Sequence, residues 1–91
     1  MSIKELQEVI DFFDDKNLNK ALNNTADKDI INLLFGIKEE GRIFRGMSAR
    51  RQERILYGMG EPPSPLEIHK SVNSIYHIIR RLSENGEIQV K

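Results

Sequence analysis

A long amphipathic stripe near the C-terminal end of the chain constrains its fold more than any other feature. Five apolar residues follow one another at intervals of four, three, four and three positions: Ile68, Val72, Ile75, Ile79 and Leu82. Because an α-helix has about 3.6 residues per turn, this spacing places all five on one face of a long helix. We expect this helix to pack across the rest of the chain and to end at Gly86.

The remainder of the chain repeats the helical spacing in shorter segments, and strict apolar–polar alternation is nearly absent. The first segment carries Ile3, Leu6, Ile10 and Phe13. Further helices are expected at residues 16–24, 27–35, 38–45 and after residue 48, with inward residues that include Ile31 and Leu56.

Polar residues separate these segments. Asp14-Asp15 predicts a break and an N-cap, Gly36 a C-cap and Ser48 another N-cap. Residues 60–65 form the clearest loop because they contain three prolines, and residues 87–90 are expected to be a short extended tail. The sequence therefore predicts an all-α fold, a single compact bundle of about five to six helices spanning residues 1–91.

Composition excludes several classes of protein. Hydrophobic residues make up 38% of the chain and charged residues 31%, which is ordinary for a globular protein. There is no cysteine, and no apolar run is long enough to span a bilayer, so we expect a cytoplasmic protein. Net charge is zero but unevenly spread, at −4 over residues 1–41 and +4 over residues 42–91. Such a division favours oriented charge–charge docking to another protein.

Residue types that carry chemistry are present without the spacing that catalysis or metal binding needs. His69 and His77 lie eight positions apart, whereas metal-binding pairs on a helix are usually four apart. Adjacent acids such as Asp14 and Asp15 do not face each other on a helix, so they form no catalytic dyad. Capping and docking both remain open for this pair. We expect no enzyme activity, no metal and no cofactor.

Arginine residues gather in the second half of the chain, as Arg42, Arg45, Arg50, Arg51, Arg54, Arg80 and Arg81. A basic patch of Arg50, Arg51, Arg54, Arg80 and Arg81, followed by the residue 87–90 tail, could belong to a winged-helix module that binds nucleic acid. Interrupting glutamates and a pI near 6.7 argue against this alternative and favour a solvated face.

Three collinear segments resemble the C-terminal domain of FliG, the rotor switch protein of the bacterial flagellum. Residues 14–36, DDKNL through DKDIINLLFG, resemble the family run DDRSIQ…DTRDLALALKG without a gap. Residues 42–50, RIFRGMSAR, resemble KIFSNMSKR, and residues 75–88, IYHIIRRLSENGEI, resemble IVEIIRRLEEEGEI. Together these segments cover nearly the whole chain.

The resemblance implies a bundle of about six helices that meets the cytoplasmic loop of the stator and other rotor and switch proteins. It implies a place in the cytoplasm, at the flagellar basal body on the inner membrane. It also implies that Asp14, Asp15, Lys16 and Lys20 are charges that face the stator. Asn23 stands where the family has an arginine, so one charge of that set is missing. Weak, salt-sensitive contacts between exposed charges suit a rotor that must release its partner at each step.

Overall fold

Six helices form the part of the chain that the structure describes, residues 1–37 and 40–88 of a computed structural model. In chain order they are α1 (Ile3–Phe12), α2 (Asp15–Asn23), α3 (Asp27–Leu34), α4 (Glu40–Phe44), α5 (Ala49–Gly58) and α6 (Pro65–Glu84). Within those ranges there is no strand. The predicted all-α bundle of five to six helices is therefore confirmed.

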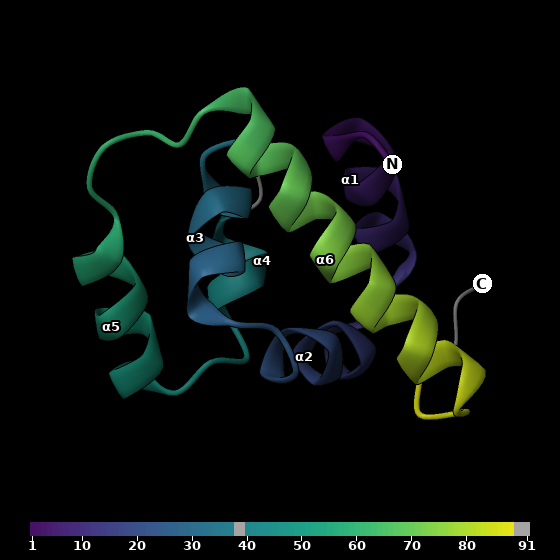
Figure 1. The fold of residues 1–91 in the computed structure, drawn as a ribbon. Coiled ribbons are helices and arrows are strands. Elements are labelled where there is room, and N and C mark those ends of the chain that lie inside the picture. Colours follow the sequence, from purple (N-terminus) through teal and green to yellow (C-terminus); the bar gives the residue numbers. More distant parts are fainter. Residues whose placement is uncertain (38–39, 89–91) are drawn as a thin grey trace.

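Helix α6 runs diagonally across the molecule and packs on α1, α2 and most extensively on α3 (Figure 1). Its stripe is buried as predicted, with Val72 and Ile75 essentially inaccessible to solvent and Ile68 partly buried. Opposite this stripe lie the fully buried side chains of the shorter helices: Leu6, Ile10, Leu18, Leu22, Ile30, Leu33 and Ile43. Burial of these apolar side chains is the main force that holds the short helices together, because helices of eight to ten residues are marginal alone.

Short polar side chains begin four of the helices. The side chains of Ser2, Asp14, Ser48 and Ser64 each accept a hydrogen bond from the backbone N–H three residues later, which satisfies one free donor of the helix that follows. The predicted caps at Asp14 and Ser48 are thus confirmed. Pro65 was expected in a loop but is the first residue of α6, where its fixed φ favours a helix start and its missing N–H costs no hydrogen bond.

Gly86 ends α6 as predicted. Its φ of 73° is the left-handed conformation that glycine adopts without steric cost, and the N–H of Glu87 donates to the carbonyl of Leu82 over 2.9 Å. Gly36 does not play the predicted role: Phe35 is the C-cap of α3, in the right-handed region, and Gly36 follows it without a positive φ. Of the predicted residue 87–90 tail, residues 89 and 90 lie outside the described residues.

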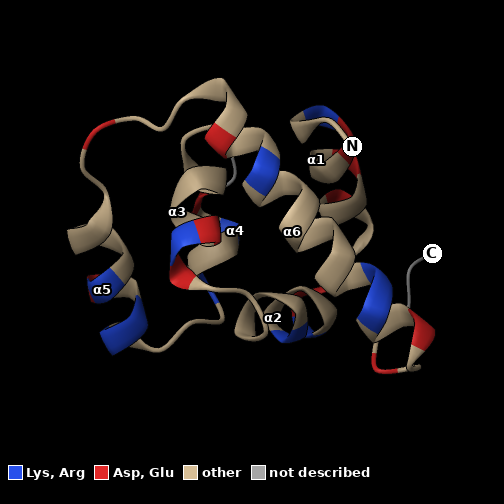
Figure 2. Ribbon diagram, in the orientation of Figure 1, with Lys and Arg blue, Asp and Glu red and all other residues tan. Residues whose placement is uncertain are grey.

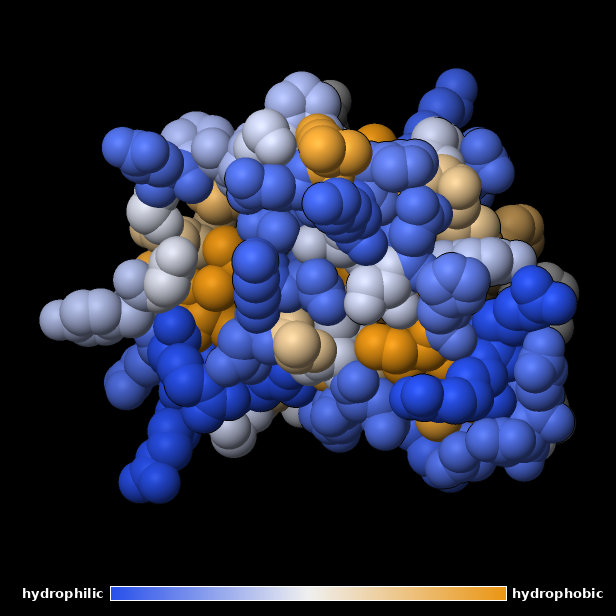
Figure 3. Space-filling view, viewed as in Figure 1, coloured by the Kyte–Doolittle hydropathy of each residue, from blue (hydrophilic) through white to orange (hydrophobic). Residues whose placement is uncertain are grey.

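Helix α5 lies at one side of the molecule, where it packs on α3, and two connectors, residues 45–48 and 59–64, join it to the other helices (Figure 1). Of its side chains only Ile55 is buried. The prediction that Leu56 points inward is wrong, because 57% of its surface is exposed, and Ile31 on α3 is only partly buried. Both differences have one cause: α5 covers its neighbour α3 incompletely, so an apolar patch is visible between α5 and α3 (Figure 3).

No helix among the described residues is both long and apolar enough to cross a membrane.

Removal of a core side chain tests this arrangement. Leu33→Ala opens a cavity between α3 and α6, and we expect it to lower the free energy of unfolding by about 2–5 kcal/mol in urea denaturation. Leu66→Ala is the matched control, because Leu66 is 61% exposed and should change that free energy by less than about 0.5 kcal/mol. Equal effects of the two substitutions would contradict the packing described above.

Candidate functional site

An arginine joins the end of α1 to the start of α2. Arg42 donates from Nη1 to the carbonyl of Ile10 over 2.6 Å and from Nη2 to the carbonyl of Phe13, and its Nε lies 3.5 Å from Oδ1 of Asp15. Arg45 adds a hydrogen bond of 3.0 Å to Oδ2 of the same carboxylate. We call the set Asp15, Arg42 and Arg45 the first clasp. It satisfies carbonyls at the end of one helix and an acid at the start of the next.

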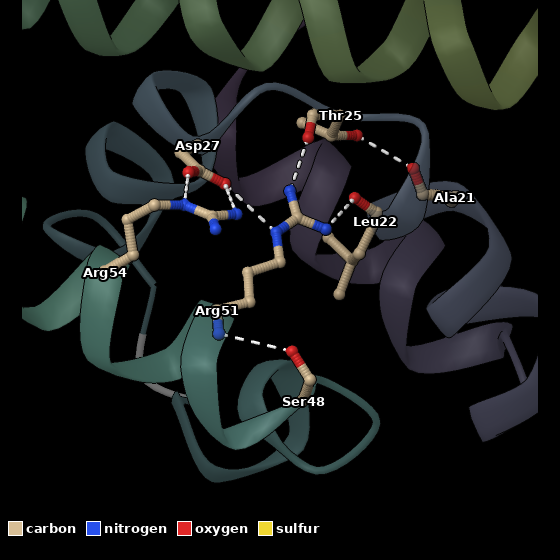
Figure 4. Close-up of polar contacts among 7 residues, drawn as sticks. All are labelled: Ala21, Leu22, Thr25, Asp27, Ser48, Arg51 and Arg54. Atoms are coloured by element: carbon tan, nitrogen blue, oxygen red, sulfur yellow. Dashed lines mark hydrogen bonds and ion pairs between the residues drawn. The ribbon is translucent and has the colours of Figure 1, made fainter.

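The same arrangement recurs at the junction of α2 and α3 (Figure 4). Arg51 donates to the carbonyls of Leu22 and Thr25 over 2.9 and 2.6 Å, and its Nε donates to Oδ1 of Asp27 over 3.0 Å. Arg54, one helical turn later, donates to the other oxygen of Asp27. We call Asp27, Arg51 and Arg54 the second clasp. Asp27 is the first residue of α3, so the carboxylate also lies at the positive end of that helix dipole.

Each clasp contains one arginine that is largely buried and one that is exposed. Arg51 has 14% of its side chain exposed, whereas Arg54 has 56%. The buried arginine of each clasp donates to backbone carbonyls as well as to the acid. The exposed arginine of each clasp donates to the acid. The exposed Arg45 and Arg54 are therefore available to solvent and to a partner, while Arg42 and Arg51 hold the fold.

The clasps set the protonation of their acids. The hydrogen bond from Arg45, helped by Arg42, lowers the pKa of Asp15, and the hydrogen bond from Arg54, helped by Arg51, lowers the pKa of Asp27. Asp27 in turn raises the pKa of Arg54. Asp15, Asp27 and Arg54 are therefore charged near neutral pH.

The four residues expected to face the stator lie together along α2 but differ in what they contact. Asp14 is exposed, and its Oδ1 accepts a 2.8 Å hydrogen bond from the N–H of Asn17. Asp15 is half-exposed and belongs to the first clasp. Lys16 is exposed, and Lys20 lies 3.6 Å from a carboxylate oxygen of Glu87. Capping, one of the two interpretations left open for the acid pair, is therefore confirmed for Asp14, and neither acid is buried.

The structure does not bring the five arginines of the expected basic patch together. Arg51 and Arg54 bind Asp27, and Arg80 forms a 3.0 Å ion pair with Glu84 on its own helix. Helix α5 and the C-terminal end of α6 lie at opposite sides of the molecule, and acidic residues separate the basic positions (Figure 2). Three of the five charges are thus already paired with acids, and no winged-helix strand is present in residues 1–37 and 40–88.

Histidine and carboxylate side chains do not converge on a metal site. His69 lies 3.1 Å from the side-chain nitrogen of Asn73, one turn further along α6. No group of three histidine, aspartate or glutamate side chains within the described ranges could hold a metal ion.

Sequence analysis did not anticipate the roles of Asp27 and of the inward-facing arginines. The sequence does contain a pattern common to the two clasps, because each pairs an acid at a helix start with two arginines three positions apart. The sequence could not show which carbonyls those arginines reach, because the partners lie 24 to 32 residues away along the chain.

The capping role of Asp14 can be separated from its charge. Asp14→Ala removes the oxygen that accepts the N–H of Asn17, so we expect a loss of about 1 kcal/mol in the free energy of unfolding. Asp14→Ser keeps a capping oxygen and should lower the free energy of unfolding by only about a few tenths of 1 kcal/mol. Thermal or urea unfolding monitored by circular dichroism would show the difference, and an equal loss in both variants would mean that the cap is not what stabilises α2.

The pKa of Asp27 predicts how the second clasp responds to pH. Because this pKa is lower in the folded state than the ordinary value of 3.8, the ionised carboxylate stabilises the fold above pH 3.8, and this contribution is lost as the pH falls through the lowered pKa. We expect Asp27→Asn to lower the free energy of unfolding at pH 7 by about 1–2 kcal/mol. Urea titrations across a pH series should show the two proteins converging below pH 3.8, and a constant difference would contradict the ionic origin of the contact.

Comparison with known proteins identifies the family. The family model for the FliG C-terminal domain matches residues 4–90, which is nearly the whole chain. The match begins at the second residue of α1 and includes the other five helices in full and both clasps. None of the curated proteins matches the chain. With a family match of this extent and an all-helical fold in the described residues, this chain belongs to the FliG C-terminal domain family of the bacterial flagellar motor switch.

Proposed function

We propose that this chain is a non-enzymatic docking domain of the flagellar rotor, which contacts the cytoplasmic loop of the stator and neighbouring switch proteins through surface charges. It would contribute to torque or to switching, in the cytoplasm at the basal body. The observation that carries the proposal is the charged start of α2, which is exposed to solvent yet fixed in position by the cap at Asp14 and by the first clasp.

A docking surface in a motor must be rigid and must also release its partner. The first clasp supplies rigidity, because Arg42 ties the end of α1 to the first residue of α2. Lys16 and Lys20 supply charges that a partner can reach. Exposed ion pairs contribute only about 0–1 kcal/mol each and are weakened by salt, so contacts of this kind form and break easily.

The four charges of α2 contribute differently in this proposal. Asp14 and Asp15 are partly engaged within the molecule, so they orient the surface and add negative potential to it. Lys16 and Lys20 then carry the positive contacts, and Asn23 contributes none. A surface of mixed charge selects a partner of complementary pattern, which is how charge gives specificity and register.

Charge reversal on α2 tests the proposal. We expect Lys16→Glu/Lys20→Glu to weaken binding of the purified chain to a synthetic peptide of the stator loop by about tenfold at low salt, since two favourable pairs become repulsive. Cells that carry the double variant should also swim more slowly. Fluorescence anisotropy at low and high salt, with circular dichroism to confirm the fold, would measure the effect.

Two further variants serve as controls. Lys28→Glu/Lys70→Glu changes net charge by the same amount at exposed positions on α3 and α6, and should leave binding unchanged. Arg50→Glu reverses an exposed charge on α5. If binding is lost with Arg50→Glu but retained with Lys16→Glu/Lys20→Glu, the docking face is α5 and the assignment to α2 is wrong. If the peptide does not bind the parent chain at all, the stator itself is not the partner.

A further inference from the structure

We infer that α5 opens as a unit while the other five helices remain folded, and that the second clasp is the latch that keeps it closed. The first observation is that α5 buries few apolar side chains. Ile55 is its only buried side chain, while Leu56 and Tyr57 are 57% and 94% exposed. Regions with few buried apolar contacts are those that open locally at low free-energy cost.

Polar contacts also hold α5 in place. Arg51 and Arg54 bind Asp27, Arg51 also binds two carbonyls, and the side-chain nitrogen of Gln52 donates to the carbonyls of Phe44 and Met47 over 3.0 Å each. Every one of these donors regains hydrogen bonds with water when α5 moves away. The net cost of losing them is therefore far smaller than that of exposing a packed core.

The connectors allow α5 to move without unfolding its neighbours. Residues 45–48 precede it and residues 59–64 follow it, and neither connector lies within a helix. Helix α6 packs on α1, α2 and α3, and these contacts do not involve α5. Arg42 of the first clasp lies on α4 and ties α1 to α2, so these contacts also persist when α5 is released. Arg45 is the first residue of the connector and contacts Asp15 ahead of the part that moves.

One close contact shows which surface α5 leaves. The backbone of Gly58 approaches the side chain of Ile31 so closely that a Cβ at position 58 would lie 2.7 Å from Ile31 Cδ1. When α5 opens, the apolar surface of α3 around the partly buried Ile31 is uncovered further. In the closed state the two arginines of the second clasp hold the part of α5 that precedes this contact.

Native-state hydrogen exchange on the whole chain tests the inference, because it reports opening helix by helix. In the parent protein we expect the amides of α5 that donate within the helix to exchange at least tenfold faster than those in the middle of α6. We expect Asp27→Asn to speed exchange in α5 by about a further tenfold, since the closed state loses its ionic contact. Arg54→Gln is the milder variant if Asp27→Asn does not fold.

Two matched controls separate local opening from global unfolding. Asp15→Asn breaks the first clasp, and Ile75→Val removes one methyl from the core under α6; both features stay intact when only α5 opens. These variants should speed exchange in α6, by several-fold for Ile75→Val, and leave the rates in α5 unchanged. If all the variants accelerate α5 and α6 equally, α5 opens only with the whole bundle. If Asp27→Asn and Arg54→Gln leave α5 unchanged, the second clasp is not the latch.

Discussion

Every helix ends with backbone carbonyls that have no partner inside the helix, and this constraint explains how the junctions between the short helices are held. Two residues separate α1 from α2 and three separate α2 from α3, and the cap N–H groups of Phe13 and Asn24 donate to some of the last carbonyls of these helices. Arg42 and Arg51, which come from later parts of the chain, donate to those carbonyls and to the acid at the start of the next helix. One planar guanidinium group thus donates hydrogen bonds to carbonyls at the end of one helix and contacts the acid at the start of the next.

These clasps connect the fold to the charged surface. Arg42 and Arg45 together fix Asp15 at a defined point between α1 and α2, at a helix start that the side chain of Asp14 already caps. The same reasoning applies to Asp27, whose helix has no side-chain hydrogen bond at its Ala26 cap. The ionic residues of the proposed docking surface therefore also order it, so charge changes on this face must be compared with variants that keep the cap or the clasp.

Sequence alone predicted the parts of the fold that depend on local pattern. The stripe on α6, the caps at Asp14 and Ser48 and the stop at Gly86 each follow from the spacing of a few adjacent residues. The burial of Leu56 was predicted wrongly, because burial depends on whether another helix covers that face, and α5 is covered on one side only. The clasps could not be foreseen for the same reason: their partners are brought together by the packing of α4 on α2 and of α5 on α3.

Apolar contacts hold some helices of this domain, and ionic contacts help to hold others. This difference suits a motor component. The stripe of α6 holds α1, α2 and α3 by apolar burial, which salt at physiological concentrations hardly weakens. Arginine contacts, which salt screens, help to hold α4 and α5. In the proposed docking, Lys16 and Lys20 exchange ionic contacts with a partner while the buried Arg42 and Arg51 keep their hydrogen bonds to backbone carbonyls. Such a partner would bind and leave at little cost, since the buried arginines and their carbonyls stay hydrogen-bonded throughout.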